Sequence, residues 1–183
     1  MTLELAAPSR SVFDAARRWR NKPDVRPGLR TPFMLTIEQQ GRFYDDVVCD
    51  RNSPHRYFTL LRKRDATIAG LGGLTNIEWE NGHAEISLIL APHFQGQGCG
   101  KEAVLLLLEE AFDRMRLETV FGEVYACNDA VDFWVGMLSS PEHWTQLPNR
   151  KMHGGVLYNS LIFWFYKVDW KAGRYHPKQE TEG

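Results

Sequence analysis

The chain has 183 residues, with 22 basic and 23 acidic side chains and a formal net charge of -1. This gives room for one domain with a substantial core, and it excludes a global electrostatic field for nucleic acid or an anionic membrane. Cys49, Cys99 and Cys127 lie far apart without CxxC spacing, so we expect reduced thiols. The first residues do not resemble a signal peptide, and no stretch approaches about 18 uninterrupted apolar residues. We therefore expect a cytoplasmic protein without a membrane span.

The first half of the chain predicts two helices and three strands. Apolar residues at helical spacing over 10–22 predict a helix that ends before Pro23. Thr36, followed three residues later by Gln39, is typical of a capping box and predicts a second helix that reaches about residue 48. Three antiparallel strands are then expected in the β-rich segments 56–63, 67–80 and 83–90.

The second half begins with a glycine-rich loop, "HFQGQGCGKE", between a strand and a helix. The helix carries one apolar stripe, made of Val104, Leu107, Leu108, Ala111, Phe112 and Met115. A strand over 119–127 follows, and the order strand, helix, strand predicts a parallel pair.

The remaining segments complete the expected order of elements. We expect a short helix within 128–138, a loop over 139–155, a long aromatic strand over 156–168 and a polar tail over 173–183. The loop includes "LPNRK", in which Arg150 and Lys151 are expected in a solvated turn; the alternative is that they shape an acceptor site or contact phosphate. The aromatic strand is expected at a sheet edge or a homodimer surface. Residues 1–183 are therefore predicted to form a single domain of the α/β (α+β) class, ordered ααβββαβαβ.

The glycine loop has the chemistry of an anion site. Backbone N–H groups at a helix N-terminus attract phosphate, and glycines let it approach the chain closely. A Walker loop is excluded because Glu102 stands where Ser or Thr would bind the metal, and a dinucleotide fingerprint fits poorly because the spacing is GxGxG. A turn without a ligand and a nucleotide-binding regulator are the alternatives at this point.

The loop resembles the hallmark of the GCN5-related N-acetyltransferases, which is Gln or Arg, two residues, Gly, one residue, and Gly or Ala. Gln95, Gly98 and Gly100 match this pattern. The segments "AEISLIL" and "GEVYACN" are similar to the two strands on either side of the family's cofactor, and "WRNKPDV" is similar to the ribosomal-protein and spermidine acetyltransferase branch. The resemblance covers roughly residues 10–170 and implies a mixed, mostly antiparallel sheet with a central splayed parallel pair, flanked by helices.

The resemblance implies acetyl-CoA as co-substrate, bound between the two splayed strands. Its pantetheine arm would pair with one strand, its pyrophosphate would lie on the loop amides, and an Asn at the end of the next strand would bond the arm. The other interpretation of that Asn is an N-cap for the following helix, and both roles can hold together. The implied cofactor-binding residues are Leu88, Ile89, Leu90, Gln95, Gly96, Gln97, Gly98, Cys99, Gly100, Lys101, Asn128 and Trp134.

Direct transfer of an acetyl group requires a base, because an ammonium must lose a proton before the amine attacks the thioester. Glu85 and Glu123 each lie five residues before an expected cofactor contact. Glu85 is the first candidate, because its place in "AEI" resembles that of the catalytic Glu in several branches, and Glu123 is the second. A surface position or a structural ion pair is the other interpretation of each.

The sequence departs from the family at the general acid. Many members place a Tyr seven residues after the Asn, but here Val135 takes that position and Trp134 precedes it. An indole N–H donates hydrogen bonds and is not a useful acid, so Trp134 is expected to pack against the cofactor arm or the substrate. Tyr125 and Tyr158 are possible replacements for the acid.

The sequence therefore favours an acetyl-CoA-dependent N-acetyltransferase whose acceptor is an amine on a small molecule, protein or peptide. The alternative is a non-catalytic acyl-CoA-binding module that has lost the acid. No metal is expected, because the histidines and cysteines show no ligand spacing.

Overall fold

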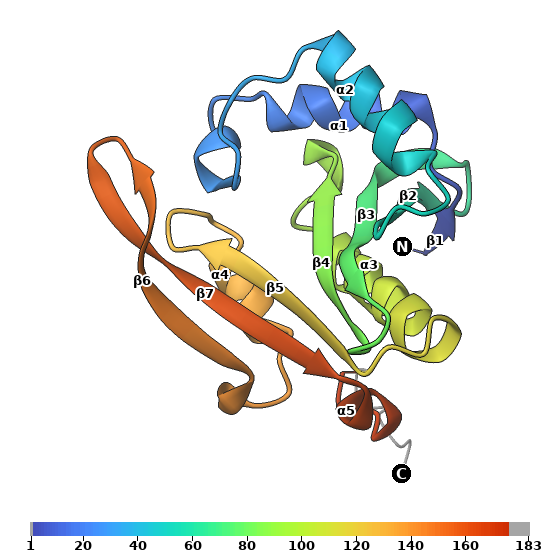
Figure 1. Cartoon of the computed structure of the whole chain (residues 1–183), viewed down its shortest axis with the longest axis vertical. Helices are drawn as coiled ribbons and strands as arrows, with labels where there is room; N and C mark the ends of the chain where they lie inside the picture. The colour runs from blue at the N-terminus through green and yellow to red at the C-terminus, as the bar shows by residue number, and fades with distance from the viewer. Residues whose placement is uncertain (1, 176–183) are drawn as a thin grey trace.

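A seven-stranded, mostly antiparallel sheet organises the computed structural model, which describes residues 2–175 (Figure 1). The sheet has the order β1-β2-β3-β4-β5-β7-β6. Its strands are β1 (Leu3–Ala6), β2 (Arg56–Arg62), β3 (Thr67–Glu78), β4 (His83–Leu90), β5 (Thr119–Tyr125), β6 (Trp144–His153) and β7 (Val156–Tyr166). The predicted fold class is confirmed.

The α-helices pack on both faces of this sheet. They are α1 (Arg10–Arg20), α2 (Ile37–Phe43), α3 (Cys99–Glu109), α4 (Val131–Gly136) and α5 (Lys167–Lys171). π-helical turns extend α2 over Tyr44–Val48 and α3 over Glu110–Arg114. Within residues 2–175, none of the helices combines the length and the apolar character that crossing a bilayer requires.

The predicted capping box is present at the start of α2. The Gln39 backbone N–H donates to Thr36 Oγ1 at 3.1 Å, and the Gln39 side-chain oxygen accepts from the Thr36 N–H at 2.9 Å. Two orphan donors of the helix are thereby satisfied, which fixes where α2 begins.

The sequence prediction missed β6, β1 and the short helix α5, and it extended the aromatic strand to residue 168, whereas β7 ends at Tyr166. The expected loop over 139–155 contains β6, which forms the sheet edge, so the aromatic strand β7 is covered on that side. An edge strand tolerates polar residues and proline, and Pro148 falls where the register between Leu147 and Lys151 shifts. Strand β1 was missed because it is short; Glu102 on α3 helps to hold it by accepting the Leu3 N–H at 2.6 Å. The predicted tail over 173–183 lies mostly outside the described residues.

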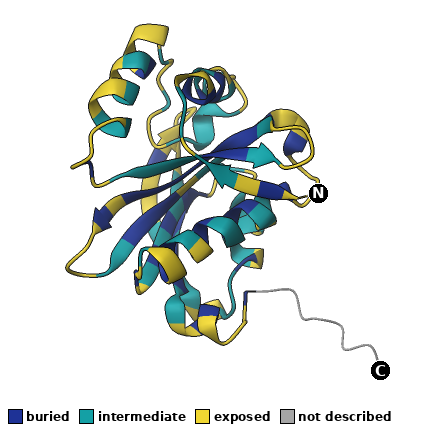
Figure 2. Ribbon diagram, turned by 90° about the vertical axis from the view of Figure 1, so that its right-hand side faces the viewer, coloured by how far each residue is buried: buried dark blue, intermediate teal, exposed yellow. Residues whose placement is uncertain are grey.

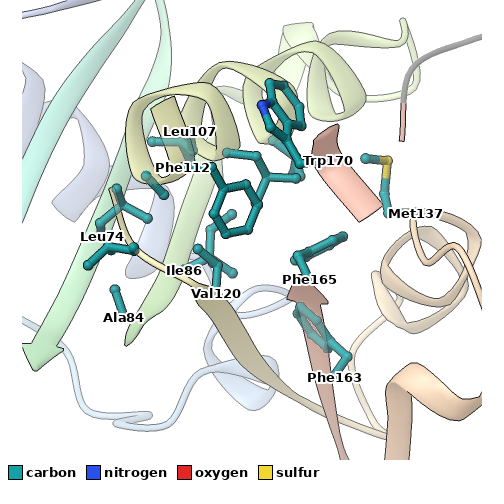
Figure 3. Packing of buried hydrophobic residues seen from close by; sticks show 14 of the residues in the cluster. Leu74, Ala84, Ile86, Leu107, Phe112, Val120, Met137, Phe163, Phe165 and Trp170 are labelled. Atoms are coloured by element: carbon teal, nitrogen blue, oxygen red, sulfur yellow. The ribbon is translucent and has the colours of Figure 1, made fainter. Parts of the chain in front are cut away.

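Helix α3 and the turn that follows it bury the predicted apolar stripe against one sheet face. Phe112 lies between the sheet and Trp170, with Ile86 and Val120 beneath it (Figure 3). Met115, at the end of the stripe, is only partly buried. Buried residues follow the strands while the outer helix faces are exposed (Figure 2). Helices α1 and α2 cover the opposite face through the cluster around Phe13.

The parallel pair β4–β5 is short, and this positions the site. The strands pair only where His83–Glu85 meets Thr119–Phe121. Beyond this point they diverge, as Figure 1 shows, while β4 continues to pair with β3 as far as Leu90. The β5-facing edge of residues 86–90 is therefore free of strand pairing.

Candidate active site

Glu85 and Glu123 lie beside the point where β4 and β5 separate, and one arginine joins them. Each glutamate side chain is only 11% exposed. The Arg30 guanidinium donates to Glu85 Oε1 at 2.5 Å and to Oε2 at 3.2 Å, and it reaches Glu123 Oε2 at 3.4 Å. The hydrogen bonds with Glu85 raise the pKa of Arg30, so this bridge stays cationic.

Glu85 is also held by the irregular end of β3. Asn76 Nδ2 donates to Glu85 Oε2 at 2.9 Å, and Asn76 has a positive φ of 50° where the β3–β4 register shifts. The Asn76 backbone N–H donates to His55 Nδ1 at 3.0 Å. Burial, assisted by the neighbouring Arg56, lowers the pKa of His55, which favours the neutral ring that can accept this bond.

Glu123 has a separate set of partners. Ser160, which is fully buried on β7, donates its hydroxyl to Glu123 Oε1 at 2.7 Å. Arg150 on β6 lies 3.6 Å from the same oxygen. Glu123 thus links three neighbouring parts of the molecule, β5, β6 and β7, in addition to Arg30.

The loop that carries Arg30 is tied to β5 and β6. Lys151 Nζ donates to the Leu29 carbonyl at 2.6 Å and lies 5.2 Å from the centre of the Tyr125 ring. Asn128 Nδ2 donates to the Gly28 carbonyl at 3.3 Å. Lys151 is 7% exposed, so the predicted solvated turn was wrong for this residue. Its burial could not be predicted, because the contact spans 122 residues.

The glycine loop directly follows β4 and leads into α3. Gly96 and Gly98 have φ values of 70° and 80°, which favour glycine, and a Cβ at either position would meet nothing within 4 Å. A Cβ at Gly100 would instead approach the Phe133 ring at 3.0 Å. Gly96 and Gly98 therefore allow the turn and leave open space above it, whereas Gly100 lets α3 pack against α4.

Glutamine side chains brace this loop. Gln95 Nε2 donates to the Leu90 carbonyl at 3.2 Å, and Gln97 Nε2 donates to the His93 carbonyl at 2.6 Å. Lys101 is exposed, whereas Cys99 is buried and so could face an anion only through its backbone. The N–H groups of the first helical turn have no carbonyl partners within the helix, so the loop fits a bound anion.

Asn128 and Trp134 are already engaged by protein groups. Asn128 Oδ1 accepts the Ala130 N–H at 2.9 Å, forming a turn immediately before α4, whose N-cap is Ala130. The Trp134 ring stacks on Phe163 with 4.7 Å between centroids. Contacts of Asn128 and Trp134 with a cofactor stay predictions, as do those of Leu88 and Ile89.

The structure brings most of the predicted site together and adds residues that the sequence did not indicate. The two glutamates, the free edge of β4 and the glycine loop are contiguous. The sequence analysis did not identify Arg30, Asn76 or His55 as part of the site. Of these, Asn76 alone had a recognisable sequence feature, because it interrupts an alternating strand and Asn tolerates positive φ. Among the described residues no group of three or more His, Cys, Asp or Glu is arranged to hold a metal ion.

Comparisons with known proteins agree with this geometry. The family model described as "Acetyltransferase (GNAT) domain" matches residues 2–132. No curated protein matches the chain. Solved structures do match it, among them a spermidine N-acetyltransferase from Vibrio cholerae in complex with CoA and spermine, with a TM-score of 0.79 and 18% identity over 93% of this chain and 98% of that one.

Two further structures from Vibrio cholerae have the same fold. A spermidine/spermine N-acetyltransferase in complex with manganese ions has a TM-score of 0.73 at 18% identity, covering 93% of this chain and 96% of that one. A dodecameric spermidine N-acetyltransferase in an intermediate state has a TM-score of 0.72 at 18% identity, covering 92% and 96%.

Proposed function

The chain belongs to the GNAT acetyltransferase family, and from this premise we propose that it transfers an acetyl group from acetyl-CoA directly to a primary amine, with Glu85 as general base. One observation carries the proposal. Glu85 is a buried carboxylate where β4 and β5 separate, on the same strand that ends in the glycine loop. In this proposal, the base and the anion site lie at the two ends of one free strand edge.

The chain's own residues fit the donor. Bound acetyl-CoA would supply a thioester carbonyl that an amine can attack. The amides of residues 95–101 would hold its pyrophosphate, with charge added by Lys101, and the free edge of Leu88–Leu90 would pair with its pantetheine arm. Asn128 would contribute its side-chain amide after releasing Gly28, and Trp134 would pack near the arm.

Glu85 would accept the proton that the attacking ammonium loses. The C–N bond would then form as the C–S bond breaks, and the nitrogen would lose a second proton on becoming an amide. Both protons would pass to solvent, the first by way of Glu85. Arg30 competes for the same carboxylate, but its side chain is 57% exposed and lies on a loop. An amine can therefore take the place of one of its hydrogen bonds. Glu123 is the second candidate for the base.

The leaving sulfur does not require an acid side chain. A free thiol ionises near pH 8.5, so CoA can leave as a thiolate that water protonates. This agrees with a Trp134 that stacks on Phe163 and offers no exchangeable proton of suitable acidity.

The compartment and the oligomeric state are inferred from the cysteines and from exposed apolar side chains. Its three free thiols suit a reducing cytoplasm. Self-association is inferred from Met152, Val156 and Leu157, which are more than half exposed near the turn between β6 and β7. Light scattering of the purified protein would measure the mass; a monomer at all concentrations would exclude a stable homodimer.

Release of CoA thiol from acetyl-CoA, measured with a panel of primary amines, tests the proposed function. We expect release that depends on both the enzyme and the amine, and an acetylated amine detected by mass spectrometry. CoA binding measured by calorimetry provides the second readout. Tight CoA binding without turnover on any amine would indicate a non-catalytic acyl-CoA-binding module, and competition by ATP or NAD would indicate a nucleotide-binding regulator.

A further inference from the structure

The carboxylates of the site are neutralised by the protein itself. Glu85 is paired with Arg30, and Glu123 is paired with both Arg30 and Arg150. Lys151 adds another positive charge beside Tyr125. A polycation binds well where carboxylates are unpaired, so this balance does not favour an acceptor with several ammonium groups.

Arg20, the last residue of α1, has no carboxylate partner in the part of the chain that the structure describes. Within residues 2–175 its side chain makes no hydrogen bond or ion pair, and its Nε is buried without a partner. Burial lowers the pKa of Arg20, as expected for a desolvated charge without a counterion. Leaving a cation in this state is costly unless a ligand supplies the missing partner.

Tyr57 and Glu85 lie on the same face of the sheet. On the sheet face under α1, Tyr57 lies opposite Gly73, and Gly73 lies opposite Ser87, two residues from Glu85 on the same side of β4. A Cβ at Gly73 would be 2.8 Å from the Tyr57 ring, so the ring covers the glycine on this face.

The electrostatics agree with this placement. The charges of Arg20 and Glu85 both act on the Tyr57 hydroxyl, and burial raises its pKa to about 12. Tyr57 therefore stays a neutral donor between a base and an unpaired cation.

We propose that the acceptor carries a carboxylate in addition to its amine, and that Arg20 binds this carboxylate while Glu85 receives the amine. The inference rests on the proposed function and names the substrate class of the same site. Arg20 is then a specificity residue, with the Tyr57 hydroxyl as a second donor. The carboxylate of such an acceptor supplies a counterion for Arg20, and its negative charge reduces the repulsion that Arg30 and Arg150 exert on a cationic amine.

The test compares amines that differ only in the acid. Amino carboxylates of increasing chain length are assayed beside their amides, with spermidine in the same series, and kcat/KM is measured by thiol release. We expect the best amino carboxylate to exceed its amide and spermidine by about 10- to 100-fold, as is usual for a hydrogen bond to a charged group. Amides or spermidine that react as well as the acids would overturn the proposal.

Variants of α1 separate binding from folding. Arg20→Gln should lower the ratio of acid to amide to about one, mainly by raising KM for the acid, whereas Arg20→Lys should retain part of the ratio. Arg18→Gln is the matched control, because Arg18 is exposed and forms an ion pair with Asp14. An unchanged ratio in Arg20→Gln would refute the role of Arg20.

The outcomes separate this inference from the proposed function. Turnover with spermidine but not with amino carboxylates would retain the acetyltransferase and reject the acidic acceptor. No turnover with any member of the series, together with tight CoA binding, would reject the proposed function itself.

Discussion

Arg30 holds the two candidate bases of the site together. Its guanidinium bridges two nearly buried carboxylates, and it is the cationic partner of Glu85, whereas Glu123 is also paired with Arg150. Breaking a buried pair by removing one partner costs more than the pair contributes, because the remaining charge is left desolvated. Arg30 therefore stabilises the site before an amine binds, and it must release part of its hydrogen bonding with the glutamates when an amine enters.

At the residue scale, the stability of the site is predicted to depend on pH through His55. Because the folded state lowers the pKa of His55, the unfolded chain binds a proton more readily below about pH 6.5. Stability should fall as the pH decreases through this range, since a protonated ring also loses its bond from the Asn76 N–H.

His55→Gln checks this prediction because glutamine keeps an acceptor and does not titrate. As the pH is lowered from about 8 to about 5.5, the urea midpoint of the variant should fall less than that of the unchanged protein. A difference that is independent of pH would show that His55 contributes nothing to the pH dependence.

The sequence predicted the two glutamates but not what surrounds them. Glu85 and Glu123 could be recognised because each stands in a short segment with an identifiable pattern. Arg30 lies 55 residues from Glu85 in an irregular segment, and no local pattern encodes that contact. Arg20 belongs to the predicted helix, but only the tertiary structure reveals that its Nε lacks a partner.

At the scale of elements, the start of α3 depends on the left-handed backbone of Gly98. Alanine fits the open space there but is strained at a φ of 80°, at a cost of roughly 1–2 kcal/mol. Gly98→Ala should therefore lower stability by about this amount and weaken CoA binding several-fold, as measured by calorimetry.

Gly136→Ala is the matched control for the loop. Gly136 ends α4 without a positive φ, and a Cβ there would meet nothing within 4 Å. Alanine should leave CoA affinity unchanged and stability equal or slightly higher. Equal CoA affinities for the two variants would argue against the loop as the pyrophosphate site.

Elements with strong local signals were predicted well, and those defined by pairing were not. The positions of α1, α2 and α3 could be predicted from caps and apolar stripes, because these signals act within a few residues. Strand β6 carries ten mostly exposed residues and gains its hydrogen bonds from β7, so its polar sequence resembles a loop. Tertiary pairing overrode the local composition in this segment.

At the scale of the whole molecule, the core beneath α3 holds together the two halves of the sheet, which are joined by only a short parallel pair. Phe112 is 1% exposed and lies centrally among residues from both halves (Figure 3). Phe112→Ala should lower the free energy of unfolding by about 3–5 kcal/mol through loss of burial and formation of a cavity.

Chemical denaturation measures this cost, and Val168→Ala is its control. Val168 is 72% exposed, so its truncation should change stability by less than about 0.5 kcal/mol. Equal losses in the two variants would contradict the assignment of Phe112 to the centre of the core.

The role of Glu85 is tested most directly by turnover and CoA affinity of Glu85→Gln, measured beside Glu123→Gln with the best acceptor amine. Removing a general base should lower kcat by about 10²- to 10⁴-fold and change the pH profile, while the dissociation constant for CoA stays within about twofold. Glu123→Gln should have the smaller effect on kcat. An unchanged rate in Glu85→Gln, with a large loss in Glu123→Gln, would contradict this account and assign the base to Glu123.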